Sequence, residues 1–204
     1  KSLWNIKGDN VMKKLTTEDM LSLEEYDKSR EEIKSNLMAH KKNRSIKIGD
    51  NVLLLFEDYQ TIKYQVQEML RIEKIFKQKD IQEEISAYEA LIPDGNNLKA
   101  TMLIMYTDIN ERKVMLNRLH DLENNVWLSI NNSKRIFAIS DEDLERSREE
   151  KTSAVHFLRF QLEQDSIDLF RKSNNIVFGV DHKEYNLQVK LDQKTIESLS
   201  NDFD

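Results

Sequence analysis

The 204-residue sequence contains no cysteine, one proline and four glycines. Without cysteine, the chain can form no disulfide, perform no thiolate catalysis and hold no zinc ion or iron–sulfur cluster through thiolates of its own. It also lacks a glycine-rich phosphate loop, a nucleophile-elbow serine and an HExxH metal motif. No cofactor is evident, and no diagnostic catalytic signature assigns an activity.

Long hydrophobic runs are also missing. No stretch approaches the roughly 20 apolar residues of a membrane span, and no signal-peptide core is visible. We therefore expect a cytoplasmic protein that does not bind membranes. The net charge of −6 provides no broad basic surface, so we expect no nucleic-acid partner. Composition does not fix the oligomeric state.

Residues 1–11 are polar and patternless, whereas Met12 to Leu15 resembles a natural start. We interpret residues 1–11 as an extension or expression remnant and residues 12–204 as one domain. The 12–97 part is predicted to be mainly helical. Its predicted elements are helices from about Ser22 to Lys42, Tyr59 to Phe76 and Asp80 to Leu91, with a hairpin, IKI-GDN-VLLLF, after the first helix.

From Leu98 the chain repeats one order of elements. Two passes of β-α-β-β are predicted, the first opening with LKATMLIMY and the second with AVHFLRFQL. The fold class is therefore α+β, with residues 98–204 duplicated and forming one mostly antiparallel sheet. Because each opening strand is apolar on both faces, we expect the N-terminal helices to form an additional layer over the face that the repeat helices leave open.

Glu73 is unusual in its predicted helix. At about 100° per residue it falls on the apolar arc with Ile62 and Val66. A carboxylate that faces a core needs a partner, because leaving it bare costs several kcal/mol. We predict that Glu73 is buried and paired with Arg159, or as second choice with Arg30.

A second polar stripe lies on the opposite side of that helix. It and its neighbours form a candidate polar site comprising Tyr64, Gln65, Glu68, Arg71, Glu73 and Arg159. Two interpretations stay open. The pair of Glu73 with an arginine could fix how the helix packs on the sheet, or the six residues could bind a ligand or substrate.

A metal site would have to use oxygen and nitrogen ligands. The candidates are Glu57, Asp58, Glu68 and His156. The alternative for His156 is a core histidine bonded to a backbone carbonyl.

Two charged segments have open interpretations. The basic cluster from His40 to Arg44 could meet a phosphate or an acidic partner, or could simply complement the negative end of a helix. The mixed-charge insert from Asp141 to Thr152 could be a lid or docking element, or a solvated helical turn.

Three phrases carry a family resemblance: YQVQEMLRIEKI, AYEALIPDG followed by LKATMLI, and EEKTSAVHFLRF. From about Met12 to Leu191 the chain resembles an uncharacterised bacterial family, the domain of unknown function numbered 3501. The family has no established activity. The resemblance implies a bacterial cytosolic protein whose gene neighbours encode rubrerythrin-like and iron–sulfur oxidoreductase proteins, and hence a partner from a redox assembly.

Two functions therefore remain open. The first is an accessory or interaction protein that serves a redox or stress-response system. The second is a small-molecule-binding protein or enzyme that uses the Gln/Glu/Arg polar site, with or without a metal. A concave pocket reached by at least three of those residues would favour the second function, whereas a packed, sealed pair would favour the first.

Overall fold

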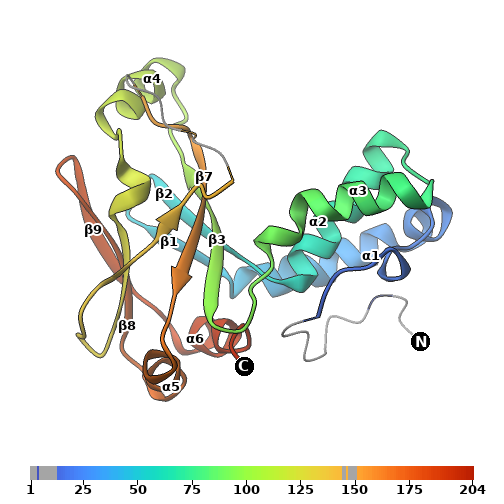
Figure 1. The fold of residues 1–204 in the computed structure, drawn as a ribbon. Helices are drawn as coiled ribbons and strands as arrows, with labels where there is room; N and C mark the ends of the chain where they lie inside the picture. Colours follow the sequence, from blue (N-terminus) through green and yellow to red (C-terminus); the bar gives the residue numbers. More distant parts are fainter. Residues whose placement is uncertain (1–3, 5–12, 144–145, 147–150) are drawn as a thin grey trace.

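The structure is a computed structural model that describes residues 4, 13–143, 146 and 151–204. It has the predicted α+β class, and Figure 1 shows a body of strands with a helical arm at one side. The helices are α1 (Leu23–Lys42), α2 (Tyr59–Glu73), α3 (Gln78–Tyr88), α4 (Ile109–Arg118), α5 (Gln164–Lys172) and α6 (Gln193–Ser200), with short 3-10 turns η1 (Thr17–Asp19), η2 (Glu89–Leu91) and η3 (Leu122–Asn125). Among the described residues, no helix is both long and apolar enough to span a membrane.

The body contains two antiparallel sheets whose inner faces share one core. The strands are β1 (Ser45–Ile48), β2 (Val52–Glu57), β3 (Asn97–Ile104), β4 (Val126–Ile130), β5 (Ile136–Phe137), β6 (Ile139–Ser140), β7 (Val155–Gln161), β8 (Ile176–His182) and β9 (Tyr185–Lys190). One sheet has the order β1-β2-β3-β7-β6 and the other β5-β4-β8-β9. Phe56 and Phe160 from the first sheet both meet Phe178 from the second, with ring centroids 5.2 Å apart in each pair.

The two β-α-β-β passes are divided between these sheets. Strand β3 pairs with β7 in the five-stranded sheet, and β4 pairs with β8 in the four-stranded sheet. The expectation of a single shared sheet is therefore corrected. Apolar strands need cover on their buried face, and here the second sheet supplies that cover. Whether the two passes arose by duplication stays a prediction.

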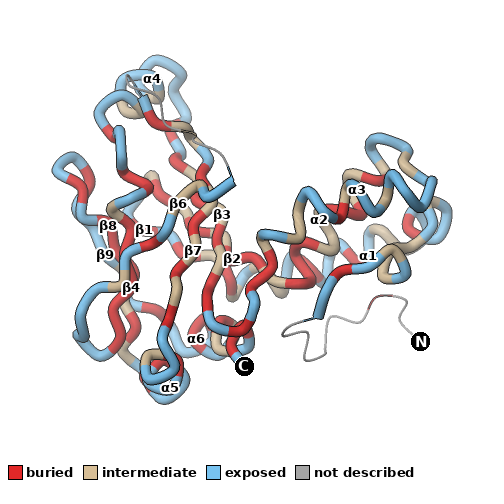
Figure 2. The backbone as a smooth tube through the Cα atoms, in the orientation of Figure 1, coloured by how far each residue is buried: buried red, intermediate tan, exposed pale blue. Residues whose placement is uncertain are grey.

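The N-terminal helices α1, α2 and α3 pack on one another and form the arm. Their core is separate from that of the body and consists of Leu15, Tyr59, Ile62, Val66, Leu70, Ile85 and Ile92. Figures 1 and 2 show that the arm projects from the body and does not lie over a sheet face. The expectation that these helices cover the sheet is therefore also corrected, because the four-stranded sheet occupies that place.

Within the proposed extension, residues 1–3 and 5–11 lie outside the described part of the chain. Trp4 is described and is buried on the arm. Its ring lies 6.4 Å from the ring of Tyr26, and the Lys63 ammonium lies 4.1 Å from the tryptophan ring centroid. At the start of α1, a capping box is present: the side chains of Ser22 and Glu25 each accept a hydrogen bond from the other residue's backbone amide.

A buried arginine joins the arm to the body. The side chain of Arg44, between α1 and β1, is only 2% exposed. Its guanidinium donates to the carbonyls of Phe56, Glu57 and Ser198 at 3.0–3.1 Å and to the Asp202 carboxylate at 2.5 Å. Arg44 therefore ties β2 to α6 and the C-terminal turn.

The root of the arm extends this network through Asp58. Asp58 caps α2 by accepting from the Thr61 amide at 2.9 Å, and its other oxygen lies 2.5 Å from His40 Nε2 and 3.4 Å from Arg44 Nε. Two members of the predicted basic cluster, His40 and Arg44, are thus used inside the fold. The phosphate-binding interpretation does not apply to them.

We expect Arg44→Met to lower the free energy of unfolding by about 3–5 kcal/mol, because it leaves the buried Asp202 carboxylate without its counter-charge. The matched control is Arg118→Met, which removes a pair with Glu184 whose side chains are 56% and 30% exposed. That control should lose less than about 1 kcal/mol. Urea denaturation of both variants measures the difference, and equal small losses would contradict the structural role of Arg44.

Candidate functional site

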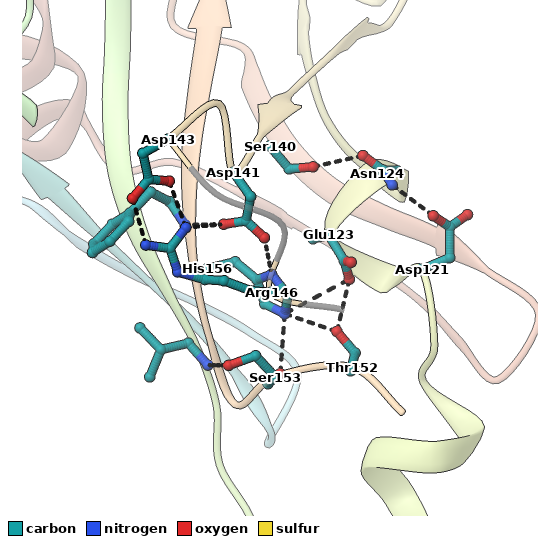
Figure 3. A network of polar contacts seen from close by, with 12 residues as sticks. Asp121, Glu123, Asn124, Ser140, Asp141, Asp143, Arg146, Thr152, Ser153 and His156 are labelled. Carbon is teal, nitrogen blue, oxygen red and sulfur yellow. Dashed lines mark hydrogen bonds and ion pairs between the residues drawn. The ribbon is translucent and has the colours of Figure 1, made fainter. Parts of the chain in front are cut away.

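A cluster of buried polar side chains surrounds His156, the second residue of β7. Inward-facing positions alternate along this strand, so His156 points into the body with Leu158 and Phe160. Four further residues converge on its ring: Glu123 from η3, Asp141 after β6, and Thr152 and Ser153 before β7. We call these five residues the His156 centre. Figure 3 shows the side chains of Glu123, Asp141 and Thr152 around the His156 ring, whereas Ser153 faces the ring with its backbone carbonyl.

Both ring nitrogens of His156 have oxygen neighbours. Nδ1 lies 2.6 Å from Asp141 Oδ2. Nε2 lies 2.8 Å from Thr152 Oγ1, 3.0 Å from the Ser153 carbonyl oxygen and 3.7 Å from Glu123 Oε2. The Thr152 hydroxyl also donates to Glu123 Oε2 at 2.9 Å. A ring placed between two carboxylates can hold a proton on each nitrogen, or keep one nitrogen free to ligate a cation.

Asp141 is held in place by further contacts. Its Oδ1 accepts from the Phe157 amide at 2.9 Å and from Arg146 Nη1 at 3.2 Å. Arg146 also pairs with Asp143 and lies 4.5 Å from the Phe157 ring centroid. The backbone of Asp141 has a positive φ of 49°, a conformation that Asp tolerates better than most residues. The Asp141 carboxylate is therefore fixed against the imidazole.

A second polar group lies between α1 and α2 and contains three of the predicted site residues. Glu68 accepts from the Tyr26 hydroxyl at 2.6 Å, from Arg30 at 2.7 and 2.9 Å, and from Arg71 at 3.3 Å. Hydrogen bonds from Arg30 lower the pKa of Glu68 from 4.5 to about 2. Burial raises the pKa of Tyr64, and the nearby negative charge of Glu68 raises it further. A carboxylate has about four acceptor positions, and those of Glu68 are all used.

The remaining predicted residues lie elsewhere. Gln65 is half-buried on α2. Arg159 is on the outer face of the five-stranded sheet, where it forms a two-pronged pair with Glu142 at 2.8 Å and also contacts Gln161. Glu73 is exposed. The set of six is thus not one site, and the predicted Glu73–Arg159 pair is wrong, as is the Glu73–Arg30 alternative.

The error for Glu73 has a local cause. Helix α2 ends at Glu73, and Lys74 adopts a left-handed conformation with φ 57°, so the helix does not continue to Phe76. Glu73 lies in the last turn, beside Glu84 of α3, whose pKa is raised by burial and then by the charge of Glu73. The apolar arc that contains Ile62 and Val66 is no longer covered at this point.

The predicted metal set is not assembled either. Glu57 accepts from the hydroxyls of Thr61 and Thr101 at 2.6 and 2.8 Å, while Asp58 caps α2 and Glu68 binds Arg30. His156 instead faces Glu123 and Asp141 in the body. Asp141 and Thr152, the two residues that bound the mixed-charge insert, are not among the predicted ligands. Residues 144–145 and 147–150 of that insert lie outside the described part of the chain, so the lid and helical-turn interpretations stay untested.

Of the four predicted metal candidates, His156 alone lies in this cluster, and its neighbours there are not the other three candidates. The signal available in the sequence was position: Asp141 and Thr152 flank an insert that returns to the start of a strand. Glu123 offered no such signal, since 33 positions separate it from His156.

We expect Glu68→Gln to destabilise the protein at pH 7 more than Glu73→Gln, an identical change on the same helix. The folded-state pKa of Glu68 is lowered, so its contribution is fully present above about pH 4.5 and is lost as the pH falls toward 2. Urea denaturation as a function of pH should show the two variants converging over that interval. A constant difference between them at every pH would contradict this assignment.

Comparison with known proteins gives a family but no activity. Among solved structures, the chain is similar to a crystal structure described as a novel protein of unknown function from Burkholderia pseudomallei, with 44% sequence identity and a TM-score of 0.88. The match covers 94% of this chain and 100% of that one. No curated protein matches. Residues 14–203 match the family described as protein of unknown function (DUF3501), and the chain belongs to this family.

Proposed function

We propose that the protein is a bacterial cytoplasmic accessory protein that binds a protein partner through the tip of its helical arm. The observation that carries this proposal is the combination of a projecting arm and a pair of exposed apolar side chains at its end. Ile72 is 59% exposed and Phe76 is 73% exposed. The arm lies away from the body, so a partner could reach the tip without meeting the sheets (Figure 1).

The turn between α2 and α3 presents Phe76. Lys74 reverses the chain, Ile75 packs toward the arm core, and Phe76 faces outward before α3 begins. Nearby, a shallow hollow of about 450 Å³ lies between η1 and α3. Its lining consists of Thr17, Gln78, Lys79, Gln82 and Glu83. Many protein interfaces place an aromatic anchor at their centre and polar groups around it.

Burying Phe76 against a partner would be favourable. Full burial of such a side chain contributes roughly 1.5–3 kcal/mol, and the packed arm holds the turn in place before binding. Ile72 and Phe76 lie four positions apart in the chain, and both side chains are more than half exposed. The partner should therefore offer an apolar recess for the ring, with polar groups around it.

The alternative, a small-molecule-binding protein or enzyme that uses the Gln/Glu/Arg polar set, has less support. The acceptor positions of Glu68 are occupied by Tyr26, Arg30 and Arg71, so the carboxylate has none left for a ligand. This is the sealed arrangement that favours an interaction protein. The family resemblance implies a partner from a redox or stress-response assembly, either a rubrerythrin-like protein or an iron–sulfur oxidoreductase.

We expect Phe76→Asp and Ile72→Asp each to weaken binding to that partner by more than about tenfold, because a charge would enter an apolar recess. The matched control is Leu169→Asp on α5, since Leu169 is also exposed, at 46%, but lies on the body. Calorimetric titration of each purified variant with the purified rubrerythrin-like or oxidoreductase protein of the same organism measures the change, and circular dichroism checks folding.

Two results would contradict different parts of the proposal. Unchanged affinity in both arm variants would move the interface away from the tip. If the unmodified protein bound neither the rubrerythrin-like protein nor the oxidoreductase, the proposed redox partner would be wrong.

A further inference from the structure

We propose that the His156 centre is a binding site for one divalent metal ion of the zinc, manganese or iron type. The ligands would be His156 Nε2, Glu123 Oε2, Thr152 Oγ1 and the Ser153 carbonyl oxygen, with Asp141 supporting the imidazole from its other side. This set differs from the metal set predicted from the sequence and is independent of the arm.

Four separations among these atoms are close to those found around one ion. Nε2 is 2.8 Å from the threonine oxygen, 3.0 Å from the carbonyl oxygen and 3.7 Å from the glutamate oxygen, and the last lies 2.9 Å from the threonine oxygen. Ligands about 2.0–2.2 Å from one ion lie roughly 3.0–3.5 Å from one another in octahedral or tetrahedral geometry. Small movements would therefore bring all four into a first shell.

Asp141 prepares His156 for this role. Its carboxylate oxygen, 2.6 Å from Nδ1, requires a proton on that nitrogen. A neutral ring protonated at Nδ1 directs the Nε2 lone pair at the three oxygens. Metal-binding histidines usually donate their other N–H to a carboxylate in this way. Contacts from the Phe157 amide and Arg146 hold Asp141 in position.

The chemistry of the donors narrows the class of ion. One imidazole with carboxylate, hydroxyl and carbonyl oxygens is a hard to borderline set. Cu⁺, which prefers soft sulfur ligands, fits poorly. The ligands are deeply buried: His156 is 0% exposed, Thr152 1% and Glu123 3%. Four protein ligands in a closed shell are typical of a structural site, which would pin η3 to the start of β7.

The competing arrangement is a network of hydrogen bonds between His156 and the same oxygens without any metal. Binding of Co²⁺ separates the two arrangements, because Co²⁺ replaces Zn²⁺ in such sites and absorbs visible light. The untagged, full-length protein is treated with chelator, dialysed and titrated with CoCl₂. We expect one Co²⁺ per chain, a visible spectrum typical of nitrogen and oxygen ligands, and a midpoint of thermal unfolding that rises with the metal concentration.

Three variants locate the ion. Asp141→Asn should weaken binding by roughly 10–100-fold, the usual effect of losing an outer-shell partner. Glu123→Gln and His156→Gln remove direct ligands and should weaken it further. The matched control is His182→Gln, because His182 is also buried but contacts the His120 carbonyl and the Glu184 amide. This control should bind Co²⁺ like the unmodified protein.

The isosteric Glu123→Gln variant keeps the test valid if His156→Gln does not fold. Elemental analysis by mass spectrometry then gives the zinc, manganese and iron content of the protein as purified, before chelation. Less than stoichiometric Co²⁺ on the unmodified protein would overturn the proposal and leave the His156 centre as a hydrogen-bonded network without a metal. Equal Co²⁺ binding by folded Glu123→Gln and the unmodified protein would also overturn it.

Discussion

Burial of the Arg44 guanidinium is the constraint on which the arrangement of the whole molecule depends. A guanidinium withdrawn from water must have its donors satisfied and its charge balanced, and here Phe56, Glu57, Ser198 and Asp202 do both. Asp202 is 158 positions from Arg44 in the chain. The root of the arm, the five-stranded sheet and the C-terminal helix therefore cannot separate without stranding a buried charge. Apolar packing brings these elements together, but it is non-directional, and the polar network determines how they meet.

The same network sets the direction of the arm. Asp58 begins α2 and also receives His40 from the end of α1, so one carboxylate holds two helices at their root. Burial opposes its ionisation, yet the charge of Arg44 and the hydrogen bond from His40 lower the pKa of Asp58 to about 2. It stays ionised at neutral pH and keeps both contacts. This rigidity matters for the proposed function, because a tip that is already held in place loses little conformational entropy when a partner covers Phe76.

Local features of the fold could be predicted from the sequence, whereas features that depend on distant contacts could not. The helix that begins after Ser22 and the hairpin of β1 and β2 rest on neighbouring residues, and both are confirmed. Helical periodicity predicts burial of a residue only where the helix and the elements that cover it continue. Helix α2 ends at Glu73, so Glu73 is exposed although it falls on the apolar arc. The apolar faces of β3 and β7 indicated that cover was needed but not that a second sheet would provide it. His156 was recognised as a candidate, but its partners depend on strand register and on the position of η3.

The His156 centre also connects the two sheets of the body. Glu123 belongs to η3, which leads directly into β4 of the four-stranded sheet, while His156 belongs to β7 of the five-stranded sheet. Their contact through Thr152 therefore links the two sheets, as Arg44 links the arm and the C-terminal helix. A cation bound at the His156 centre would strengthen the link between the two sheets without involving Arg44 or the arm. Coupling between distant sites requires an element with two alternative arrangements, and the closed hydrogen bonds of Arg44 favour a single one. Loss of the metal should therefore lower the stability of the body and leave the arm tip able to bind.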